Sequence, residues 1–501
     1  MQEYAEAAAL SSFERSREVF EAVIGTLTSP QADAWTHAEL EEQLQERGRD
    51  LLRQLLQDRL DLNAAQEQRR EDVIDIEFVR RTRAERGHQR QLTSIFGTVT
   101  VERMAYRTPG TVNLYPTDAA LNLPVEKHSH GLRRLAAIEA VRGSFDDAVT
   151  AIDRATGVRL GKRQVEALAQ AAAVDVDAFY AAARPTPRSG EWVLVLSADG
   201  KGIVMLPKAL RELTARAAKT TTRRLASRLS PGEKLGRKRM AEVGAVYDCL
   251  PVTRTPEQIM TRGKAPAEPG PLAEAKWLTA SVAESTAQVI ADVFDEAARR
   301  DPQHLRSWLV LVDGNNHQIE RVIAEAAERK VEITIVIDFI HVLEYLWKAA
   351  WTFFYTGDPD AEAWVADKAR KVLEGKALQV ATGIRRRATA GGFSTTERNN
   401  ADTCADYLTA KAPYLDYTTA LRRGWPIATG IIEGAVRHVV KDRMDITGAR
   451  WGLPGAEAIL KLRALTANGD FPAYWAFHLR KEHERVHQAR YLTRDKLALV
   501  A

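Results

Sequence analysis

Residues 191–202 read EWVLVLSADGKG, an apolar run followed by a short polar segment that contains one aspartate, Asp199. A short apolar run of this kind is typical of a buried β-strand. Asp-Gly is also a frequent turn pair, so Asp199 has two readings: a turn residue, or a carboxylate placed at the end of a strand. The residues that follow, GIVML (202–206), are close enough to form a second strand that pairs with the first.

Further strands and helices alternate after this stretch. AEVGAVYDCLPVT (241–253), SWLVLVDG (307–314) and VEITIVIDF (331–339) have the apolar character of strands. Residues 280–301 and 317–330 have helical periodicity and lie between them. An initial hairpin followed by parallel strands with crossover helices predicts an α/β fold.

Three of these apolar strands end in aspartate: Asp199, Asp313 and Asp338. Taken singly, such a residue is most often turn chemistry or a helix cap. The carboxyl ends of neighbouring parallel strands lie at one edge of a sheet, where ligands bind, so the three carboxylates are expected to converge. Clustered carboxylates repel one another and usually require a cation, and oxygen-only ligands favour Mg²⁺ or Mn²⁺.

The charge of the chain is strongly segregated. The net charge of the 501 residues is +4, but residues 201–240 contain twelve Lys/Arg against two Glu, a local balance of +10, so the remainder totals −6. Such a basic block favours a polyanion partner, and a solvated basic surface is the alternative. The candidate phosphate contacts in it are Arg223, Arg224, Lys234, Arg237, Lys238 and Arg239.

Cysteine content and hydropathy restrict the class of protein. Cys249 and Cys404 are far apart and form no Cys-x-x-Cys pattern, so neither a disulfide framework nor a cysteine zinc site is expected. The first residues do not resemble a secretory signal, and no apolar run approaches the roughly 18–20 residues that cross a bilayer. We therefore expect a cytoplasmic protein without membrane contact.

The N-terminal half is predicted to be mostly helical up to about residue 92. Leucines recur at helical spacing in ELEEQLQERGRDLLRQLLQDRLD (39–61). RRTRAERGHQR (80–90) is basic and is expected to be a linker or a DNA-facing arm. LTSIFGTVTVERMAYR (92–107) alternates, which predicts a short antiparallel hairpin with Gly97 in its course.

Residues 144–171, SFDDAVTAIDRATGVRLGKRQVEALAQA, have the layout of a helix-turn-helix. Ser144 is a candidate cap for the first helix, Gly157 falls in the turn, and Gly161 precedes the second helix. A recognition helix presents polar and basic residues early, although helical hairpins that bind no DNA can look the same. The candidate DNA-reading residues are Arg159, Lys162, Arg163 and Gln164.

An ordered set of motifs resembles the bacterial insertion-sequence transposases of the ISKra family. The resemblance covers about residues 92–480 and is carried by VLVLSADGKGIVM (193–205), RKRMAEVGAVYD (237–248), WLVLVDGNNHQIERV (308–322), ITIVIDFIHVLEYLW (333–347) and GIIEGAVRHVVKDRMDITGARW (430–451). It implies a DDE enzyme with a ribonuclease-H-like core and a helical insertion, preceded by mostly α-helical DNA-binding regions.

The resemblance also implies roles for single residues. Asp199 matches the first catalytic acid, and Glu433 matches the last, on a helix after an insertion; an ordinary helix-surface glutamate is the alternative for Glu433. Asp313 is favoured as the middle acid, with Asp338 and His341 close to the site. His341 would orient a carboxylate or a phosphate, unless it is a satisfied buried histidine. Two Mg²⁺ or Mn²⁺ ions would be held, with Asp199 between them and Asp313 and Glu433 on either side.

The sequence departs from relatives of this type in one respect. They often carry a cysteine pair after the tyrosine of the small hairpin, whereas MAYRTPGTVNLYPTD (104–118) contains none. A zinc-stabilised module is therefore in doubt, and hydrophobic packing is expected to hold this region.

The predicted function is a DNA transposase that binds insertion-sequence ends and target DNA and carries out metal-dependent cleavage and strand transfer, as a homo-oligomer on DNA by analogy. The alternatives are a ribonuclease-H-like nuclease without strand transfer, a domesticated DNA-binding protein without catalysis, and a two-carboxylate glycosidase, which the basic block disfavours. The predicted segments are 1–91 (helical), 92–130 (hairpin module and linker), 131–186 (helix-turn-helix), 187–351 (first part of the core), 352–428 (helical insertion), 429–480 (last part of the core) and 481–501 (tail).

Overall fold

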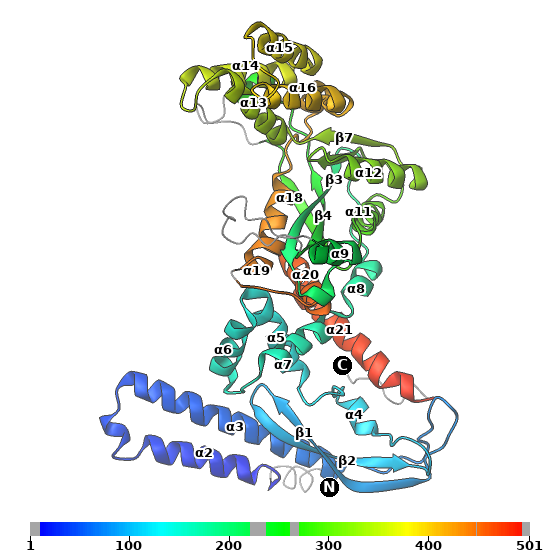
Figure 1. The fold of residues 1–501 in the computed structure, drawn as a ribbon. Helices are drawn as coiled ribbons and strands as arrows, with labels where there is room; N and C mark the ends of the chain where they lie inside the picture. Colours follow the sequence, from blue (N-terminus) through cyan, green and yellow to red (C-terminus); the bar gives the residue numbers. More distant parts are fainter. Residues whose placement is uncertain (1–10, 221–236, 261–269, 447, 493–501) are drawn as a thin grey trace. The chain divides into compact units, whose positions relative to one another are not determined.

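The computed structural model describes residues 11–220, 237–260, 270–446 and 448–492 (Figure 1). Contacts divide the chain into two compact units: unit 1 is Met1–Ala181 with Asp470–Ala501, and unit 2 is Ala182–Gly469. Within the described ranges, no helix combines the length and the apolar character that crossing a lipid bilayer requires.

The described part of unit 1 starts with two helices and a β-hairpin. The first described elements are α2 (Glu14–Leu27), η1 (Ala32–Ala34), α3 (His37–Gln66), β1 (Arg83–Ser94) and β2 (Gly97–Arg107). Thr36 and Glu39 form a capping box at the start of α3. The predicted hairpin is confirmed, with Gly97 at its turn, where φ is +119°.

The basic segment 80–90 is not a linker or an arm, because strand β1 begins at Arg83 and pairs with β2 from Arg83↔Arg107 to Ser94↔Gly97. Only Leu92 and Ser94 of β1 are buried, so the strand is polar along most of its length. It has no apolar alternation to reveal it in the sequence, and its pairing with β2 stabilises it instead.

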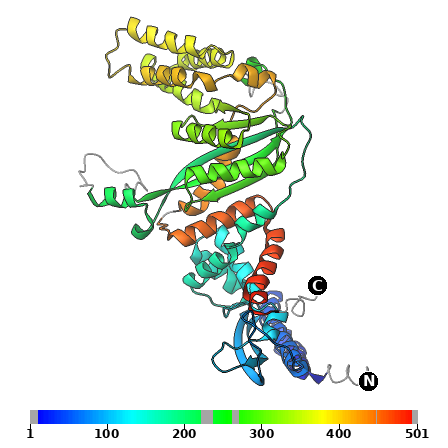
Figure 2. The same cartoon turned by 90° about the vertical axis from the view of Figure 1, so that its right-hand side faces the viewer.

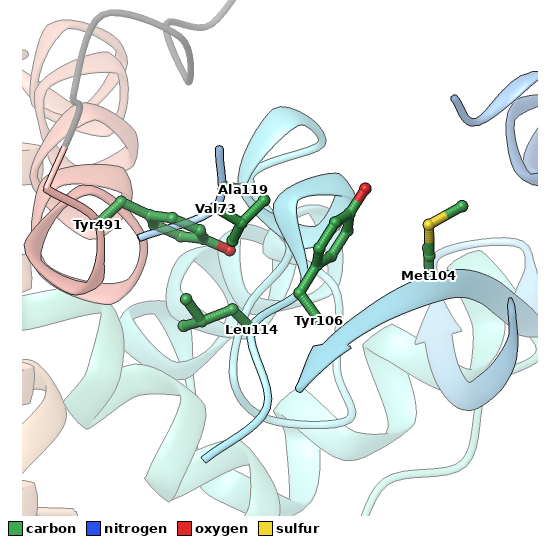
Figure 3. Close-up of a cluster of buried hydrophobic side chains, with 6 residues drawn as sticks. All are labelled: Val73, Met104, Tyr106, Leu114, Ala119 and Tyr491. Carbon is green, nitrogen blue, oxygen red and sulfur yellow. The ribbon is translucent and has the colours of Figure 1, made fainter. Parts of the chain in front are cut away.

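A hydrophobic cluster holds the hairpin module together (Figure 3). Tyr106 of β2 is buried in it, and so is Tyr491, which lies close to the end of the described chain. The whole cluster is Val73, Met104, Tyr106, Leu114, Ala119 and Tyr491. The expectation that apolar packing holds this region is therefore confirmed, and the residues expected to form a C-terminal tail belong to unit 1. The elements around the cluster are α4 (Pro116–Ala120), α21 (Phe471–Val486) and η5 (Gln488–Arg490).

The helical arrangement predicted for residues 144–171 is present. Helix α6 (Phe145–Thr156) begins after Ser144, whose hydroxyl accepts the Asp147 N–H, and ends at Gly157 with φ of +70°. Helix α7 (Lys162–Ala173) follows, and α5 (His130–Arg142) packs against both. Helix α8 (Val176–Ala182) completes this part.

Unit 2 is a mixed α/β structure built on a five-stranded sheet. In spatial order the strands are β5 (Ala273–Ser281), β4 (Lys238–Cys249), β3 (Val193–Val204), β6 (Trp308–Val312) and β7 (Ile333–Ile337). The β3–β4 and β4–β5 pairs are antiparallel, whereas β6 runs parallel to β3 and β7 runs parallel to β6. The α/β class and the parallel strands after an antiparallel start agree with the sequence analysis.

One prediction about this sheet is wrong. Residues 202–206 do not fold back on the first strand, because β3 is one strand that continues through Asp199 and Gly200. Its register with β4 is unbroken from Val193↔Cys249 to Val204↔Lys238. The Asp-Gly pair is therefore not a turn, and the strand that the sequence analysis missed is β5.

Helices cover both faces of the sheet. Figure 1 shows α11 (Thr286–Arg300) and α12 (Asn316–Arg329) on one side and α18 (Gly430–Ala435) on the other. Gly244 of β4 lets α11 approach closely, since a Cβ there would lie 2.4 Å from Val293. The remaining elements are η2 (Pro207–Ala209), α9 (Glu212–Thr220), α10 (Pro256–Met260), η4 (Val436–Lys441, a π-helix), α19 (Asp442–Met444) and α20 (Leu453–Ala467).

The stretch between β7 and α18 is helical, as predicted, and its helices gather at one end of the unit (Figure 2). They are α13 (Phe339–Phe353), α14 (Pro359–Leu373), α15 (Ala377–Ala390), α16 (Asn399–Lys411), η3 (Ala412–Tyr414) and α17 (Tyr417–Arg422). Helix α16 packs against α13 and α15.

Candidate active site

Asp199 and Asp313 lie near each other, one within strand β3 and the other directly after the adjacent parallel strand β6. The register of β3 and β6 ends at Ser197↔Leu311, and each aspartate lies two residues further along its segment. Burial raises the pKa of the Asp199 carboxyl, and the charge of Asp313 raises it further. The Gly200 N–H, 2.6 Å from Asp199 Oδ1, lowers it in part. The predicted convergence of these two acids is present.

A tyrosine from the helical insertion fixes the turn that carries Asp313. The Tyr407 hydroxyl of α16 donates a hydrogen bond to the Asp313 carbonyl oxygen, at 3.2 Å. Gly314 has φ of +96°, and a Cβ there would lie 2.7 Å from the same hydroxyl. The ring of Tyr407 stacks on Tyr345 of α13, with centroids 3.9 Å apart. The glycine of this Asp-Gly pair is therefore required both by its backbone angle and by the close tyrosine.

His341 lies beside Asp313 on α13. Its Nε2 is 3.9 Å from Asp313 Oδ2, and its Nδ1 is 3.5 Å from Glu344 Oε2. The side chains of His341 and Asp313 are 34% and 39% exposed, so His341 is not a buried core histidine. A histidine held between two carboxylates can orient Asp313 toward a ligand.

Asp338 differs from Asp313 because it is completely buried. It caps α13, with Oδ1 accepting the Ile340 N–H at 2.8 Å. Its Oδ2 accepts a hydrogen bond from the Thr429 hydroxyl, and the same hydroxyl lies 3.1 Å from Glu433 Oε1. Asp338 therefore supports Glu433 from behind, and it is not open to a ligand.

Glu433 lies on the exposed side of α18, and its carboxyl meets that of Asp338. Partial burial of the carboxyl raises the pKa of Glu433, and the hydrogen bond to Asp338 and the charge of Asp338 raise it further. The helix continues from α18 directly into the π-helix η4, a feature that is rare and often found at functional sites.

The five predicted acidic and histidine residues thus fall into two groups connected by His341. Asp199 and Asp313 form one, and Asp338 and Glu433 form the other; His341 lowers the pKa of both Asp199 and Glu433. Within the part of the chain that the structure describes, no three Asp, Glu, His or Cys side chains form a ready ligand set for a metal. The donor chemistry nevertheless fits a hard cation, because carboxylates with raised pKa values crowd one edge of the sheet.

Sequence reasoning missed three neighbours of these acids. Thr429 bonds to Asp338 from 91 residues away, and Tyr407 bonds to Asp313 from 94 residues away. No local pattern in the sequence indicates the contact of Tyr407. The only signal for Thr429 was its position four residues before Glu433, which places both on one face of a helix. Glu242 of β4 also raises the pKa of Asp199, and a Cβ at Gly200 would lie 2.8 Å from its carboxylate. Gly200 is thus explained by this close approach.

The basic block is only partly available to a ligand. Arg223, Arg224 and Lys234 lie outside the described residues. Arg237 and Lys238 are exposed at the start of β4. Arg239 is a structural residue instead, since its guanidinium donates to the carbonyl oxygens of Val282 (2.6 Å), Ala283 (3.0 Å) and Ala209 (3.3 Å). Its prediction as a phosphate contact is not supported by this geometry.

The four residues predicted to read DNA share the first turn of α7 and the loop before it. Arg159 and Arg163 are exposed, and Lys162 is exposed while its Nζ lies 2.7 Å from Asp146. Gln164 is occupied, because its Oε1 accepts the Gly161 N–H at 2.8 Å and closes the cap. The exposed residues at this surface are therefore the three cations, of which Lys162 pairs with Asp146 and Arg159 lies 3.7 Å from Asp153.

No protein-family model matches the chain, and no curated protein matches its sequence. The resemblance to the ISKra transposases thus remains a prediction from the motifs.

Proposed function

We propose that unit 2 is a ribonuclease-H-like catalytic core. The strand arrangement supports this: the first three strands are antiparallel neighbours, and the fourth and fifth lie on the other side of the first and run parallel to it. A long helical stretch then separates the fifth strand from the helix that carries Glu433. This is the order of elements that the motif resemblance implies.

We further propose that the chain is a DDE-type DNA transposase. The observation that carries the proposal is the placement of Asp199 and Asp313 side by side, with Glu433 within electrostatic range of His341 at the same edge. Three carboxylates from the first strand, the fourth strand and a late helix are the set expected for two-metal phosphodiester chemistry.

In this proposal Asp199, Asp313 and Glu433 would hold Mg²⁺, with Asp338 as a support for Glu433. The bound ions would activate the attacking oxygen and stabilise the leaving oxygen. The chain itself positions the reactants: His341 orients the Asp313 carboxylate, and Tyr407 fixes its backbone. Lys201 lies two residues after Asp199 on β3, so it projects from the same face and can bind a phosphate.

DNA binding is assigned to unit 1 through α7 and to the basic start of β4. Arg159, Lys162 and Arg163 would enter or flank a groove, as a recognition helix does. Arg237 and Lys238 would contact phosphates without reading sequence. We propose double-stranded DNA, both transposon ends and target, as the substrate, and a homo-oligomer as the form that acts on it.

Two other functions use the same residues. A ribonuclease-H-like nuclease would cleave DNA without joining it, and a domesticated protein would bind DNA without either step. The four carboxylates are all present, which favours catalysis over binding alone.

The test is the product pattern of the purified chain with Mg²⁺, a supercoiled plasmid and linear duplexes that carry the DNA flanking its own reading frame. The proposal predicts duplex ends joined to the plasmid. Cleaved ends without joined products would support the nuclease, and bound but uncut DNA would support the non-catalytic protein.

A charge variant tests the assignment of α7. Lys162→Glu with Arg163→Glu should weaken binding of the same duplexes and lower the salt dependence of the remaining binding. The matched control is Lys368→Glu with Lys371→Glu on α14, two cations of unit 2 that are not assigned to DNA. Unchanged binding by the α7 variant would contradict the assignment.

A further inference from the structure

The helical hairpin of α2 and α3 buries few of its apolar side chains. Residues 11–66 are all described, and the buried hydrophobic residues among them are Ala32, Leu60 and Leu62. Leu60, near the end of α3, packs with Leu92, Val99 and Val101 of the β-hairpin. Five large apolar side chains of this segment are between 38% and 49% exposed: Phe20, Ile24, Leu44, Leu52 and Leu55. Outside the part of α3 that packs on the β-hairpin, the apolar side chains of the two helices therefore stay largely exposed, which is typical of an interaction surface.

The exposed side chains lie on one face of the hairpin. The Ser16 hydroxyl donates to Asp58 Oδ2 at 2.6 Å, which marks the line along which the antiparallel helices meet. With about 100° per residue, Phe20 and Ile24 lie about 40° and 80° past Ser16. By the same geometry Leu44, Leu55 and Leu52 lie about 40°, 60° and 120° past Asp58. In antiparallel helices, equal rotation past the contact line leads to the same face.

The charges on α3 make this face electrostatically complementary to the same face of a second copy of the chain. Glu41 and Arg59 are exposed and share one rotational position, about 100° past Asp58, at opposite ends of the helix. Residues 37–46 contain four Glu and no Lys or Arg, whereas Arg47, Arg49, Arg53 and Arg59 follow. A two-fold axis at Asp50 therefore brings Glu41 onto Arg59 of the partner subunit.

The same axis brings Gly48 onto Leu52 of the partner subunit. Gly48 interrupts a 30-residue helix, where a glycine costs about 1 kcal/mol relative to alanine. Nothing lies within 4 Å of the place where its Cβ would be, so the site is open. A glycine opposite a leucine lets two helices approach closely. Such a contact would explain why α3 has a destabilising glycine at position 48.

We propose that this face, formed by Phe20, Ile24, Leu44, Gly48, Leu52 and Leu55 with Glu41 and Arg59 at its ends, is a homodimer interface in which two α3 helices cross antiparallel. The occupant is a second copy of the chain, because the charge pattern is complementary to itself about one axis. The interface does not depend on the proposed catalytic function.

The test is sedimentation equilibrium of the full chain without DNA, over a range of concentrations. Glu41→Arg and Arg59→Glu, made singly, each face a like charge, so each should raise the dissociation constant of the dimer at least about tenfold. The double variant restores opposite charges and should return the constant to within about threefold of the original. Glu46→Arg is the matched control, since Glu46 is exposed on the opposite side of α3 and should leave the constant unchanged.

A second variant tests the apolar part of the face. Leu52→Glu should abolish the dimer, while Val112→Glu, at a residue that is 79% exposed elsewhere in unit 1, should not. Circular dichroism of both variants establishes that they are folded. A single-chain mass for the unaltered protein at every concentration would overturn the proposal. A dimer whose constant is the same in Glu41→Arg, Arg59→Glu and Leu52→Glu would overturn it as well, since the dimer would then use another surface.

Discussion

The ends of β6 and β7 have the same sequence layout and different structures. Each strand is a short apolar run followed by an aspartate and then a helix. Asp313, after β6, is 39% exposed and faces His341. Asp338, after β7, is fully buried, with one oxygen on the Ile340 N–H and the other on the Thr429 hydroxyl.

The difference shows that the neighbours of a strand-end aspartate, and not its local sequence, decide what it does. A carboxylate whose oxygens are both engaged and shielded from solvent stabilises the fold and its neighbours. A carboxylate that keeps an exposed oxygen beside another acid can receive a cation. The comparison favours Asp313 over Asp338 as the metal ligand of the proposed function, with Asp338 as a support.

The largest expected effect comes from exchanging each aspartate for alanine. Asp313→Ala should reduce DNA cleavage by at least about 10²–10³-fold, the loss found when one charge-stabilising group leaves a preorganised site. Its unfolding free energy should fall by less than about 1 kcal/mol, because one exposed hydrogen bond is lost. Asp338→Ala should lower the unfolding free energy by about 1–3 kcal/mol, because a buried N–H and a hydroxyl lose their acceptor.

Urea unfolding and a cleavage assay on the same preparations measure both quantities. The comparison is broken if Asp313→Ala destabilises more than Asp338→Ala, or if Asp313→Ala keeps full activity.

A shared hydroxyl gives the next effect. Thr429→Val removes the donor to buried Asp338 and should cost about 1–3 kcal/mol of unfolding free energy, because a buried acceptor is left unsatisfied. Thr429→Ser keeps the hydroxyl and serves as the control. Equal unfolding free energies for Thr429→Val and Thr429→Ser would contradict the role of Asp338 as a hydrogen-bonded support.

The pH dependence of the unfolding free energy of the metal-free protein tests the environment of Asp199. The pKa of Asp199 is raised in the folded state, so the folded protein holds this proton more tightly than the unfolded chain does. Its contribution to stability is complete below the usual aspartate pKa of about 3.9 and is lost as the pH rises through the raised value. Asp199→Asn should therefore stabilise the metal-free protein at neutral pH and flatten this slope.

Urea unfolding at acidic and neutral pH, with chelator present, measures the effect. Asp33→Asn, at an exposed aspartate of η1, is the control. A metal-free Asp199→Asn protein less stable than the original at neutral pH would contradict this prediction.

The smallest effect is expected at the tyrosine that holds the Asp313 turn. Tyr407→Phe removes one hydrogen bond of 3.2 Å and should cost about 0.5–1.5 kcal/mol, with the ring stack retained. Cleavage should require more Mg²⁺ for half-maximal rate, because the Asp313 backbone is held less firmly. Tyr355→Phe, at a residue that is 71% exposed, is the control; an unchanged Mg²⁺ requirement in Tyr407→Phe would remove the positioning role.

Local patterns predicted much of this fold. The apolar runs of β6 and β7, the helices between the strands, and the cap at Ser144 each depend on residues within one element, so the sequence is sufficient to place them. The continuation of β3 through Asp199 was missed, because β4 supplies its hydrogen bonds from about forty residues away. The polar part of β1 before residue 92 was missed for the same reason, since it is held by its pairing with β2.

The sequence predicted the acidic residues of the candidate site, but it did not predict the residues that hydrogen-bond to them. Asp313 is recognisable from the end of an apolar strand, whereas Asp199, which lies within β3, and Glu433 are recognisable from the motifs. The hydrogen bonding of Asp338 depends on Thr429, which follows the helical insertion. The turn at Asp313 depends on Tyr407, which lies within the insertion. Arg239 was misassigned because its acceptors are backbone carbonyls of distant residues, which no charge pattern reveals.

The most direct test of the central claim is DNA joining by the unaltered chain and by Asp199→Asn in the same Mg²⁺ buffer, with both proteins shown to be folded. The account predicts that the unaltered chain joins duplex ends to plasmid and that Asp199→Asn yields neither cleaved nor joined DNA. Equal product formation by the two proteins would contradict the assignment of this edge of the sheet as the active site.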